Sequence, residues 1–564
     1  MRRIPKTLVL KPGAPKFVDR LRREASDLEN HVVDEFLAGR LDRRGLLREG
    51  SRFGLALPLI GGLLGTANPF GVSRALAQAG QKDATIRVAS PTPAGAVEPV
   101  TVANEGGLVM LMQTGEFLIF DQPDLVLRPM LALSWKANSD GTVWSFTLRP
   151  NVKFHNGHML NADDVVATMD RLANPKNGSN ALSAFRGVLS VGGTRKVDDL
   201  TVEFHLDAPN GSFPYIVSSD NYNAIILPAD YGGDFEKTFI GTGPFKLDKY
   251  TAKVGASFVR NPDYWGGKAL PARTEFTFFA DQQPQILALQ GGQVDIILHM
   301  VVQGAQGLLN DPDVKIVKTR AATHRQLHMR TDMPKFADKR VRQAIALTLD
   351  RPALAAGLFR GLAEPGNDSP FAPVYPSTNK EVPQRKKDLA AARALMAAAG
   401  VPNGFEATLT TERVQEIPDY AVLVQNACRE IGVKLNLKIE TDSAYYGKAQ
   451  PGQSDWLDSE MGITDYGHRG VPNVLLGAPL LSTGAWNAAH FKNPTYDGLV
   501  AQYTATTDLG VQRELAGKIQ TLLLDETPVI FAYFYDYLMA TAQGVSGVTV
   551  TAISQIFLAN ATIA

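Results

Sequence analysis

From residue 85 onward the sequence alternates strand patterns with helix patterns, and this alternation limits the fold more than any other feature. Residues 201–206 place apolar and polar side chains alternately, which is typical of a half-buried strand. Asn161, Asp338 and Asp388 each precede a segment with apolar residues at helical spacing, as N-cap residues do. Strands that alternate with helices predict an α/β fold.

The composition excludes several classes of protein. The chain has 564 residues, with 57 basic and 57 acidic side chains and one cysteine. A single Cys428 cannot form an internal disulfide and leaves no cysteine-rich metal centre. Its place within a helix pattern predicts a small buried core residue. A formal net charge of zero is also untypical of a protein built around a nucleic-acid groove, so we expect no nucleic-acid partner.

The first 77 residues differ from the remainder in charge and in pattern. They hold 14 Lys and Arg against 8 Asp and Glu, so this segment carries +6 and the rest of the chain −6. Arg43 and Arg44 precede an uncharged stretch, residues 53–73, after which come Ala75 and Ala77. This order matches the charged region, apolar region and A-x-A cleavage site of a secretory signal peptide. The paired arginines resemble the twin-arginine export signal.

We therefore expect residues 1–77 to be a signal peptide and the mature protein to be soluble and acidic in the periplasm. The alternative is a membrane anchor, because residues 53–73 reach the length that spans a bilayer. The glycines and Pro58 in that stretch make a weak span and favour the signal peptide. No cysteine stands at the cleavage site, so we do not expect a lipoprotein.

The sequence carries no recognised motif for catalysis. It contains no H-E-x-x-H, no G-x-S-x-G and no phosphate-binding P-loop. The only close histidine pairs are His155 with His158 and His324 with His328, and neither has further metal ligands nearby in the sequence. We expect neither an enzyme nor a bound cofactor or metal.

Seven segments, taken in order, resemble one family. The longest runs from residue 131 to residue 157, where a tryptophan, an Asp-Gly turn, a strand and Arg-x-x-Val-Lys-Phe-His follow one another. The other six segments are 161–166, 241–245, 260–266, 288–295, 338–345 and 493–497. In this order they resemble the extracytoplasmic solute-binding proteins of ABC importers, in the large peptide, dipeptide and nickel class known as solute-binding protein family 5.

The resemblance implies a type II periplasmic-binding-protein fold, in which two lobes are joined by a hinge and an extra α/β domain is inserted in the first lobe. A ligand held between the lobes stabilises the closed form. On this chain the first lobe is expected at residues 84–120, 241–320 and 527–564, the inserted domain at 121–240, and the second lobe at 321–526.

The same resemblance suggests ligand-binding residues in the second lobe. A Gly-Ile-Thr-Asp-Tyr segment matches the family segment whose Asp pairs with a peptide's α-ammonium, so Thr464, Asp465 and Tyr466 are candidates. A cation is the natural partner of a buried carboxylate. Ile463 stands where the family has tryptophan, and residues 471–473 lack the usual carboxylates. These two departures leave the dependence on an α-ammonium open.

Further candidates are a guanidinium and a group of flat side chains. Arg413 lies where some members of the family hold a peptide carboxylate, and a guanidinium suits that bidentate contact. Tyr446, Trp486 and Asn487 offer apolar faces with polar edges, which suit a cleft that accepts varied side chains. A role as ordinary core or surface residues is the alternative for these three.

The sequence thus predicts a non-catalytic, monomeric binding protein that delivers a peptide or peptide-like solute to an ABC permease in the inner membrane. An oligosaccharide, an opine-like conjugate or chelated nickel would be alternative ligands in the same transport role. A secreted hydrolase without a recognisable motif and a chemosensory receptor built on the same fold are alternatives from other classes.

Overall fold

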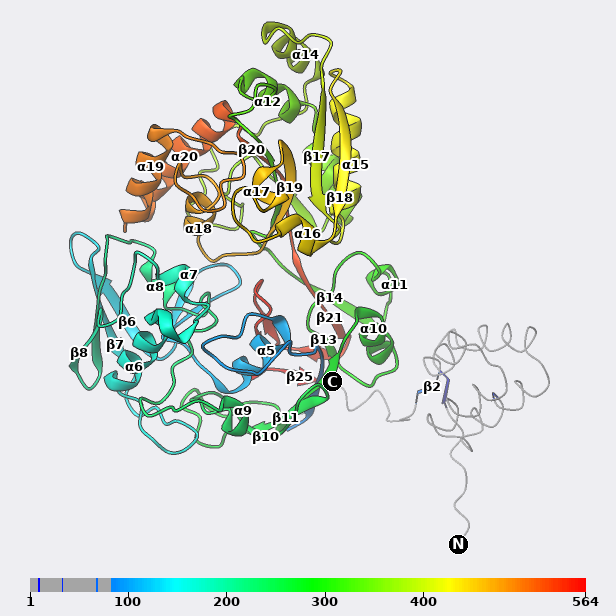
Figure 1. The fold of residues 1–564 in the computed structure, drawn as a ribbon. Helices are drawn as coiled ribbons and strands as arrows, with labels where there is room; N and C mark the ends of the chain where they lie inside the picture. Colours follow the sequence, from blue (N-terminus) through cyan, green and yellow to red (C-terminus); the bar gives the residue numbers. More distant parts are fainter. Residues whose placement is uncertain (1–8, 11–32, 34–66, 69–82) are drawn as a thin grey trace.

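A computed structural model describes residues 9–10, 33, 67–68 and 83–564. Residues 83–564 form two α/β lobes, which Figure 1 shows one above the other. The remaining described strands, β1 (Val9–Leu10) and β2 (Ala67–Asn68), pair antiparallel. Within the described residues, no helix is long and apolar enough to cross a membrane.

The first lobe is built on a seven-stranded sheet with the order β10-β11-β12-β3-β13-β21-β14. β3 (Thr85–Pro91) pairs in parallel with β12 (Arg273–Phe279) and β13 (Ile296–Ile297). The antiparallel strands are β10 (Phe245–Thr251), β11 (Gly255–Arg260), β14 (Val314–Thr319) and β21 (Tyr537–Ala542). The helices are α5 (Glu105–Thr114), α10 (Gln282–Gln290) and α11 (Gln306–Leu309). Near the C-terminus, β22 (Val545–Ser546) pairs with β25 (Thr562–Ile563), and β23 (Thr549–Val550) with β24 (Ile556–Phe557).

The second lobe is built on a six-stranded sheet with the order β16-β20-β15-β19-β17-β18. Its strands are β15 (His324–Met329), β16 (Ala363–Pro365), β17 (Glu406–Glu412), β18 (Lys434–Glu440), β19 (Met461–Tyr466) and β20 (Val529–Tyr535). Its helices are α12 (Lys339–Leu347), α13 (Arg351–Phe359), α14 (Leu389–Ala398), α15 (Ile417–Arg429), α16 (Asp442–Tyr446), α17 (Asp455–Asp458), α18 (Asn473–Gly477), α19 (Pro494–Ala505) and α20 (Leu509–Glu526).

The inserted domain has a four-stranded antiparallel sheet with the order β6-β7-β9-β8. The four strands are β6 (Ala132–Ala137), β7 (Val143–Leu148), β8 (Thr194–Asp198) and β9 (Thr201–His205). β4 (Ile119–Asp121) and β5 (Leu127–Pro129) pair antiparallel in a separate two-stranded sheet. Its α-helices are α6 (Ala162–Ala173), α7 (Leu182–Phe185), α8 (Phe213–Ile216) and α9 (Phe235–Thr238), and a 3-10 turn covers Pro175–Asn177. One hydrophobic core includes Val88 of β3 and Phe146 of β7, so this domain packs on the first lobe.

The local patterns in the sequence predicted these elements well. The side chains of Asn161, Asp338 and Asp388 each accept a backbone N–H in the first turn of α6, α12 and α14, at 2.8 to 2.9 Å. Residues 201–206 contain strand β9. Cys428 is fully buried in α15, as its helix pattern predicted.

One predicted boundary is wrong by nine residues. Residues 527–564 were expected in the first lobe, but β20 pairs antiparallel with β15 and β16 in the sheet of the second lobe. The chain returns to the first sheet only at Asp536, directly before β21. Pairing across the sheet, which local pattern does not reveal, decides to which lobe an apolar strand belongs.

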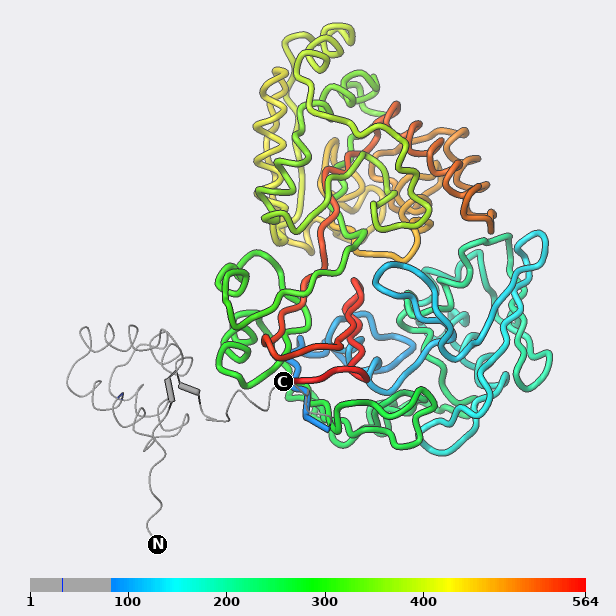
Figure 2. Tube along the Cα trace, turned by 180° about the vertical axis from the view of Figure 1, so that it is seen from behind, coloured from blue at the N-terminus to red at the C-terminus, as the bar shows by residue number. Residues whose placement is uncertain are grey.

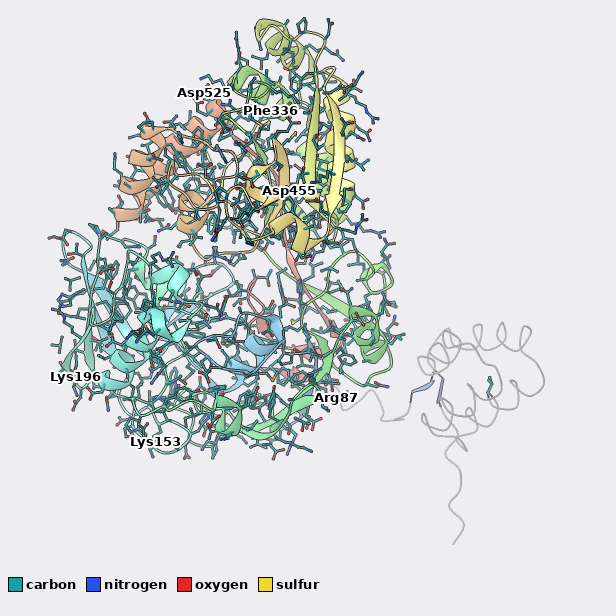
Figure 3. All side chains as sticks on the ribbon, viewed as in Figure 1. Arg87, Lys153, Lys196, Phe336, Asp455 and Asp525 are labelled. Carbon is teal, nitrogen blue, oxygen red and sulfur yellow. The ribbon has the colours of Figure 1, made fainter. Side chains whose placement is uncertain are left out.

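Two crossing segments join the lobes. Residues 320–323 connect β14 to β15, and Asp536 connects β20 to β21. The N–H of Tyr535 donates to the carbonyl of Thr323 at 3.0 Å, so the segments lie side by side, as Figure 2 shows in green and red. In Figure 3 the labelled Arg87 lies in the first lobe, Lys196 in the inserted domain and Asp455 in the second lobe.

Candidate ligand-binding site

The carboxyl ends of two neighbouring strands place several candidate residues on one edge of the second lobe. β17 and β19 run parallel and end at Glu412 and Tyr466. Ligands of open α/β sheets bind outside the carboxyl ends of such strands. Arg413 and Asp465 therefore share this edge, and Figure 1 shows α16, next to it, facing the first lobe.

Asp465, the predicted anchor for an α-ammonium, already contacts a cation of the protein. Arg325 is its direct partner in the antiparallel pair of β15 and β19, and the Arg325 guanidinium forms an ion pair with the Asp465 carboxylate. Arg325 is fully buried and also binds Glu416 with two hydrogen bonds of 2.7 and 3.0 Å. The hydroxyl of Tyr535 accepts a third hydrogen bond at 2.7 Å.

This ion pair affects both the pKa of Asp465 and its ability to bind a ligand cation. Burial raises the pKa of Asp465, and the charge of Arg325 opposes that rise. The Asp465 side chain remains 37% exposed, so it can still accept a hydrogen bond from a ligand. Because Arg325 already balances its charge, Asp465 does not need a ligand cation as its partner. The sequence did not suggest Arg325, although an arginine inside an otherwise buried strand is a signal for it.

A second carboxyl group, Glu412, lies beside Asp465. It is buried, and it accepts hydrogen bonds from the Asp465 backbone N–H at 3.1 Å and from the Tyr446 hydroxyl at 3.0 Å. Burial, followed by a hydrogen bond with Asp442, raises the pKa of Glu412 to about 7. This edge of the lobe therefore has an acidic character that changes with pH near neutrality.

Aromatic rings form a wall next to the carboxyl groups. Ring centroids of Tyr446 and Trp456 are 5.3 Å apart, and those of Tyr466 and Trp486 are 6.2 Å apart. Tyr446 and Trp486 are half-buried, so part of each ring is exposed, and ligand contact stays a prediction for both. Tyr466 is only 7% exposed and stacks on His324 with centroids 5.5 Å apart, which makes it a core residue.

The remaining predicted residues differ in whether their polar groups already form hydrogen bonds within the protein. Thr464 is buried, and its hydroxyl is 2.9 Å from that of Tyr445. The amide of Asn487 bonds the backbone of Leu481 and Phe491 at 2.8 to 3.0 Å, so it holds its own loop in shape. Arg413 is exposed, and no residue in the described ranges bonds its guanidinium, which leaves that group free for a ligand.

The first lobe contributes a polar group that the sequence did not suggest. Glu105, at the start of α5, lies 2.6 Å from Nδ1 of His299 and accepts a hydrogen bond from the hydroxyl of Ser554. Burial raises the pKa of Glu105, but His299 and Ser554 outweigh it and hold that pKa below its usual value. The His299 ring stacks on Tyr537 with centroids 4.4 Å apart. These residues come from four separate segments, so no sequence motif joins them.

The four histidines of the two sequence pairs differ in their contacts and burial. His158 contacts the buried Asp164 at 3.1 Å, whereas burial lowers the pKa of His155 and of His328 to about 4. Burial likewise lowers the pKa of His324 to about 3. Among the described residues, no group of three or more His, Cys, Asp and Glu could hold a metal ion. The predicted export residues Arg43 and Arg44 and the cleavage residues Ala75 and Ala77 lie outside the described residues.

Two α/β lobes joined by two adjacent crossing segments, with polar and aromatic side chains on the facing edge, define a two-lobed solute-binding protein. A family model described as bacterial extracellular solute-binding proteins, family 5, middle part, matches residues 126–472. The chain belongs to this family.

Named relatives agree with this assignment, and a solved structure agrees with the fold. The chain is 26% identical over 434 residues to heme-binding protein A of Haemophilus influenzae, covering 72% of this chain and 78% of that protein. It is 27% identical over 444 residues to di/tripeptide-binding protein 1 of Pseudomonas aeruginosa, covering 73% of this chain and 81% of that protein. The solved structure of HbpA2 from Haemophilus parasuis is similar in fold, with a TM-score of 0.75, 23% identity, and coverage of 85% of this chain and 100% of that one.

Proposed function

We propose that this protein captures a peptide or peptide-like solute between its lobes and delivers it to the permease of an ABC importer. The observation that carries the proposal is the edge formed by β17 and β19. There, Arg413 with its free guanidinium follows β17, and Asp465, whose side chain is 37% exposed, lies near the end of the neighbouring strand β19. A peptide needs a cationic partner for its carboxylate and acceptors for its N–H groups, and this edge supplies both.

The aromatic wall supports the same proposal. Tyr446 and Trp486 present half-buried rings beside the polar groups. Flat rings accept side chains of different shape at a low cost in conformational entropy. The di/tripeptide-binding relative, which is 27% identical to this chain over 444 residues, makes a short peptide the first ligand to test.

A thermal-shift screen tests the proposal. The protein is heated with free-amine peptides, N-acetylated peptides, oligosaccharides and nickel chelates in parallel. A ligand at 100 times its Kd should raise the stability by about 2.7 kcal/mol. A shift with peptides that Arg413→Ala weakens would support the proposal, with the exposed, unrelated Arg360→Ala as a matched control. Shifts with oligosaccharides or nickel chelates alone would keep the transport role and change the solute, whereas turnover of a probe would favour a hydrolase.

We further infer that the protein is exported by the twin-arginine route, cut after Ala77, and soluble and monomeric in the periplasm. The pair Arg43 and Arg44 ahead of an uncharged stretch supports this proposal. Replacing both arginines by lysine should keep the full-length chain in the cytoplasm, which cell fractionation measures. Normal processing of that variant would contradict the route while leaving the proposed solute unaffected.

A further inference from the structure

The segment between β19 and α18 carries an arginine, Arg469, that no sequence motif indicated. Arg469 follows Asp465 by four residues, directly beyond the edge that forms the candidate site. Figure 1 and Figure 2 show this segment, in gold, on the face of the second lobe that is turned toward the other two units. The side chain is half-buried. It therefore adds a cation to the face on which the candidate residues lie.

The residues on either side of Arg469 are bonded to other parts of the protein. Nδ1 of His468 accepts a hydrogen bond from the N–H of Ala322, in a crossing segment, at 2.9 Å. The N–H of Gly470 donates to Oδ1 of Asp220, in the inserted domain, at 2.7 Å. The backbone around Arg469 is thus held in place by contacts that leave its guanidinium unused.

The guanidinium of Arg469 keeps most of its donors. Its one hydrogen bond within the described residues runs to the carbonyl of His468, the preceding residue, at 2.8 Å. No Asp or Glu in the described part of the chain forms an ion pair with it. A guanidinium has five N–H donors, so four remain for a partner from outside.

The charge of Arg469 acts on groups of both neighbouring units without direct contact. Burial raises the pKa of Asp220 to about 6, and the charge of Arg469 opposes that rise. The same charge opposes the rise that burial causes in the pKa of Tyr222, also in the inserted domain. In the second lobe, burial, followed by the charge of Arg469, lowers the pKa of His468 to about 3. The guanidinium therefore lies between the inserted domain and the second lobe.

Open space connects Arg469 with the candidate site. Gly467 is exposed, and a Cβ added to it would meet only Nη1 of Arg469, at 3.7 Å, apart from its own chain neighbours. Gly467 is two residues from Asp465, which an extended chain spans in at most about 7 Å. The guanidinium thus lies on the order of 10 Å from Asp465, which is about the length of three extended residues. A short peptide can reach both groups.

The charges on this face favour an anionic solute. Asp465 already contacts the guanidinium of Arg325. Arg413 and Arg469 have no carboxylate partner in the described ranges of the chain. A guanidinium binds a carboxylate through two parallel N–H bonds, which a neutral amide or a hydroxyl cannot match in strength. Two such guanidinium groups can accept two carboxylates.

We propose that Arg469 binds a carboxylate of the transported solute, and that Arg469 and Arg413 together select a peptide-like solute with two carboxylates. This inference rests on the proposed function and deepens it by naming the charge of the solute. Because Gly470, next to Arg469, is bonded to the inserted domain, a solute held by Arg469 would favour the arrangement in which the units are in contact.

Isothermal titration with matched tripeptides tests this assignment. Alanine tripeptides that carry one glutamate, at the first, second or third position, have two carboxylates, and the same peptides with glutamine have one. We expect wild type to bind at least one glutamate peptide about 10-fold more tightly than its glutamine counterpart. Arg469→Gln and Arg413→Gln should each lose this preference, because one guanidinium then remains for two carboxylates. Arg195→Gln, which removes an exposed arginine of β8, should keep it.

A conservative variant separates binding from a purely structural role. Arg469→Lys should keep part of the preference, because it retains the charge without the bidentate fork. If Arg469 only balances Asp220, Arg469→Gln will lower the melting temperature without peptide and leave the preference unchanged, which would overturn the inference. Equal binding of the glutamate and glutamine peptides by wild type would overturn the inference and keep the proposed function. No binding of any of the six peptides by wild type would overturn both.

Discussion

Two groups of carboxylates in this protein have opposite electrostatic surroundings. At the end of β19, Asp465 contacts the buried guanidinium of Arg325, which also binds Glu416. Where the inserted domain meets the second lobe, at a junction marked by the hydrogen bond from Gly470 to Asp220, no cation forms an ion pair with Asp121 or Asp220 among the described residues. Burial raises the pKa of both groups, although the charge of Arg469 opposes that rise for Asp220. The second lobe places a cation against its buried carboxylates, whereas burial at the junction favours the protonated forms of Asp121 and Asp220.

The comparison teaches that an acidic residue at a family's binding position is not by itself a free binding group. Asp465 lies in the segment that resembles the family's anchor, yet its cation comes from the next strand of the same sheet. Asp121 and Asp220 lie in no motif, yet Oδ1 of Asp121 is buried without a hydrogen-bond partner among the described residues, and burial raises the pKa of both groups. Four changes would break or sharpen this contrast.

Removing Arg325 should leave the carboxylates of the second lobe without a contacting cation, as at the junction. We expect this change to have the largest effect on the free energy of unfolding. Arg325→Met leaves Glu416 buried without a cation, so we expect the free energy of unfolding to fall by about 3 to 5 kcal/mol. Urea denaturation at pH 7 measures it. Arg320→Met is the control, because Arg320 pairs with Glu364 on the surface, where such pairs contribute less than about 1 kcal/mol. Equal losses in the two variants would contradict the importance of the buried pair.

The junction should make stability depend on pH. The pKa of Asp220 is about 6 in the folded protein and near 3.8 for an ordinary Asp, so the folded state binds more protons between these values. Stability should therefore fall as the pH rises from about 4 to about 6, by up to about 3 kcal/mol. The melting temperature, measured across this pH range, should change less with pH in Asp220→Asn than in wild type and Asp124→Asn. The same change of melting temperature with pH in all three proteins would show that Asp220 ionises freely in the folded state.

Adding a methyl group to Gly470 should sharpen the comparison at the junction. Its Cβ would lie 2.6 Å from Oδ2 of Asp121 and 2.9 Å from Oδ1 of Asp220, so these buried side chains must move, at about 2 kcal/mol. Gly467→Ala is the matched control, because its Cβ would meet only the Arg469 guanidinium at 3.7 Å. Chemical denaturation compares the two variants. A Gly470→Ala protein as stable as the control would mean that the two carboxyl groups can move aside at little cost.

The smallest effect should come from the hydroxyl of Tyr446. Tyr446→Phe removes the donor that binds Glu412 at 3.0 Å, so we expect the pKa of Glu412 to rise above about 7 and stability to change by about 1 kcal/mol. Carbon NMR of labelled glutamate carboxyl groups measures the pKa. Tyr445→Phe removes a hydroxyl that bonds Thr464 instead, and it should leave the titration of Glu412 in place. An unchanged pKa in Tyr446→Phe would show that burial alone sets its value.

Much of the fold followed from local patterns in the sequence. Asn161, Asp338 and Asp388 predicted helix starts because an N-cap bonds only the next few residues of its own helix. Alternation predicted β9 for the same reason, since the side-chain period of a strand is local. The strand β20 was assigned to the wrong lobe because its partners, β15 and β16, are far away in the sequence.

The candidate site followed from the sequence only in part. The resemblance to the family suggested Asp465 and Arg413, and both lie at the carboxyl ends of the neighbouring strands β19 and β17. Whether these residues contact a ligand stays a prediction. The sequence could not show that Asn487 bonds its own loop or that Tyr466 is a core residue, because both depend on packing against other elements.

The sequence by itself determined the α/β class, the helix starts and the membership of a two-lobed family, since each of these depends on short-range pattern or on motifs in order. Only the tertiary structure decided which buried carboxylates have a cation as direct partner and which have their pKa raised by burial. Arg325 reaches Asp465 across 140 positions, and Gly470 reaches Asp220 across 250. The charge state of a buried group depends on burial and on neighbours in space, and no local pattern in the chain records either.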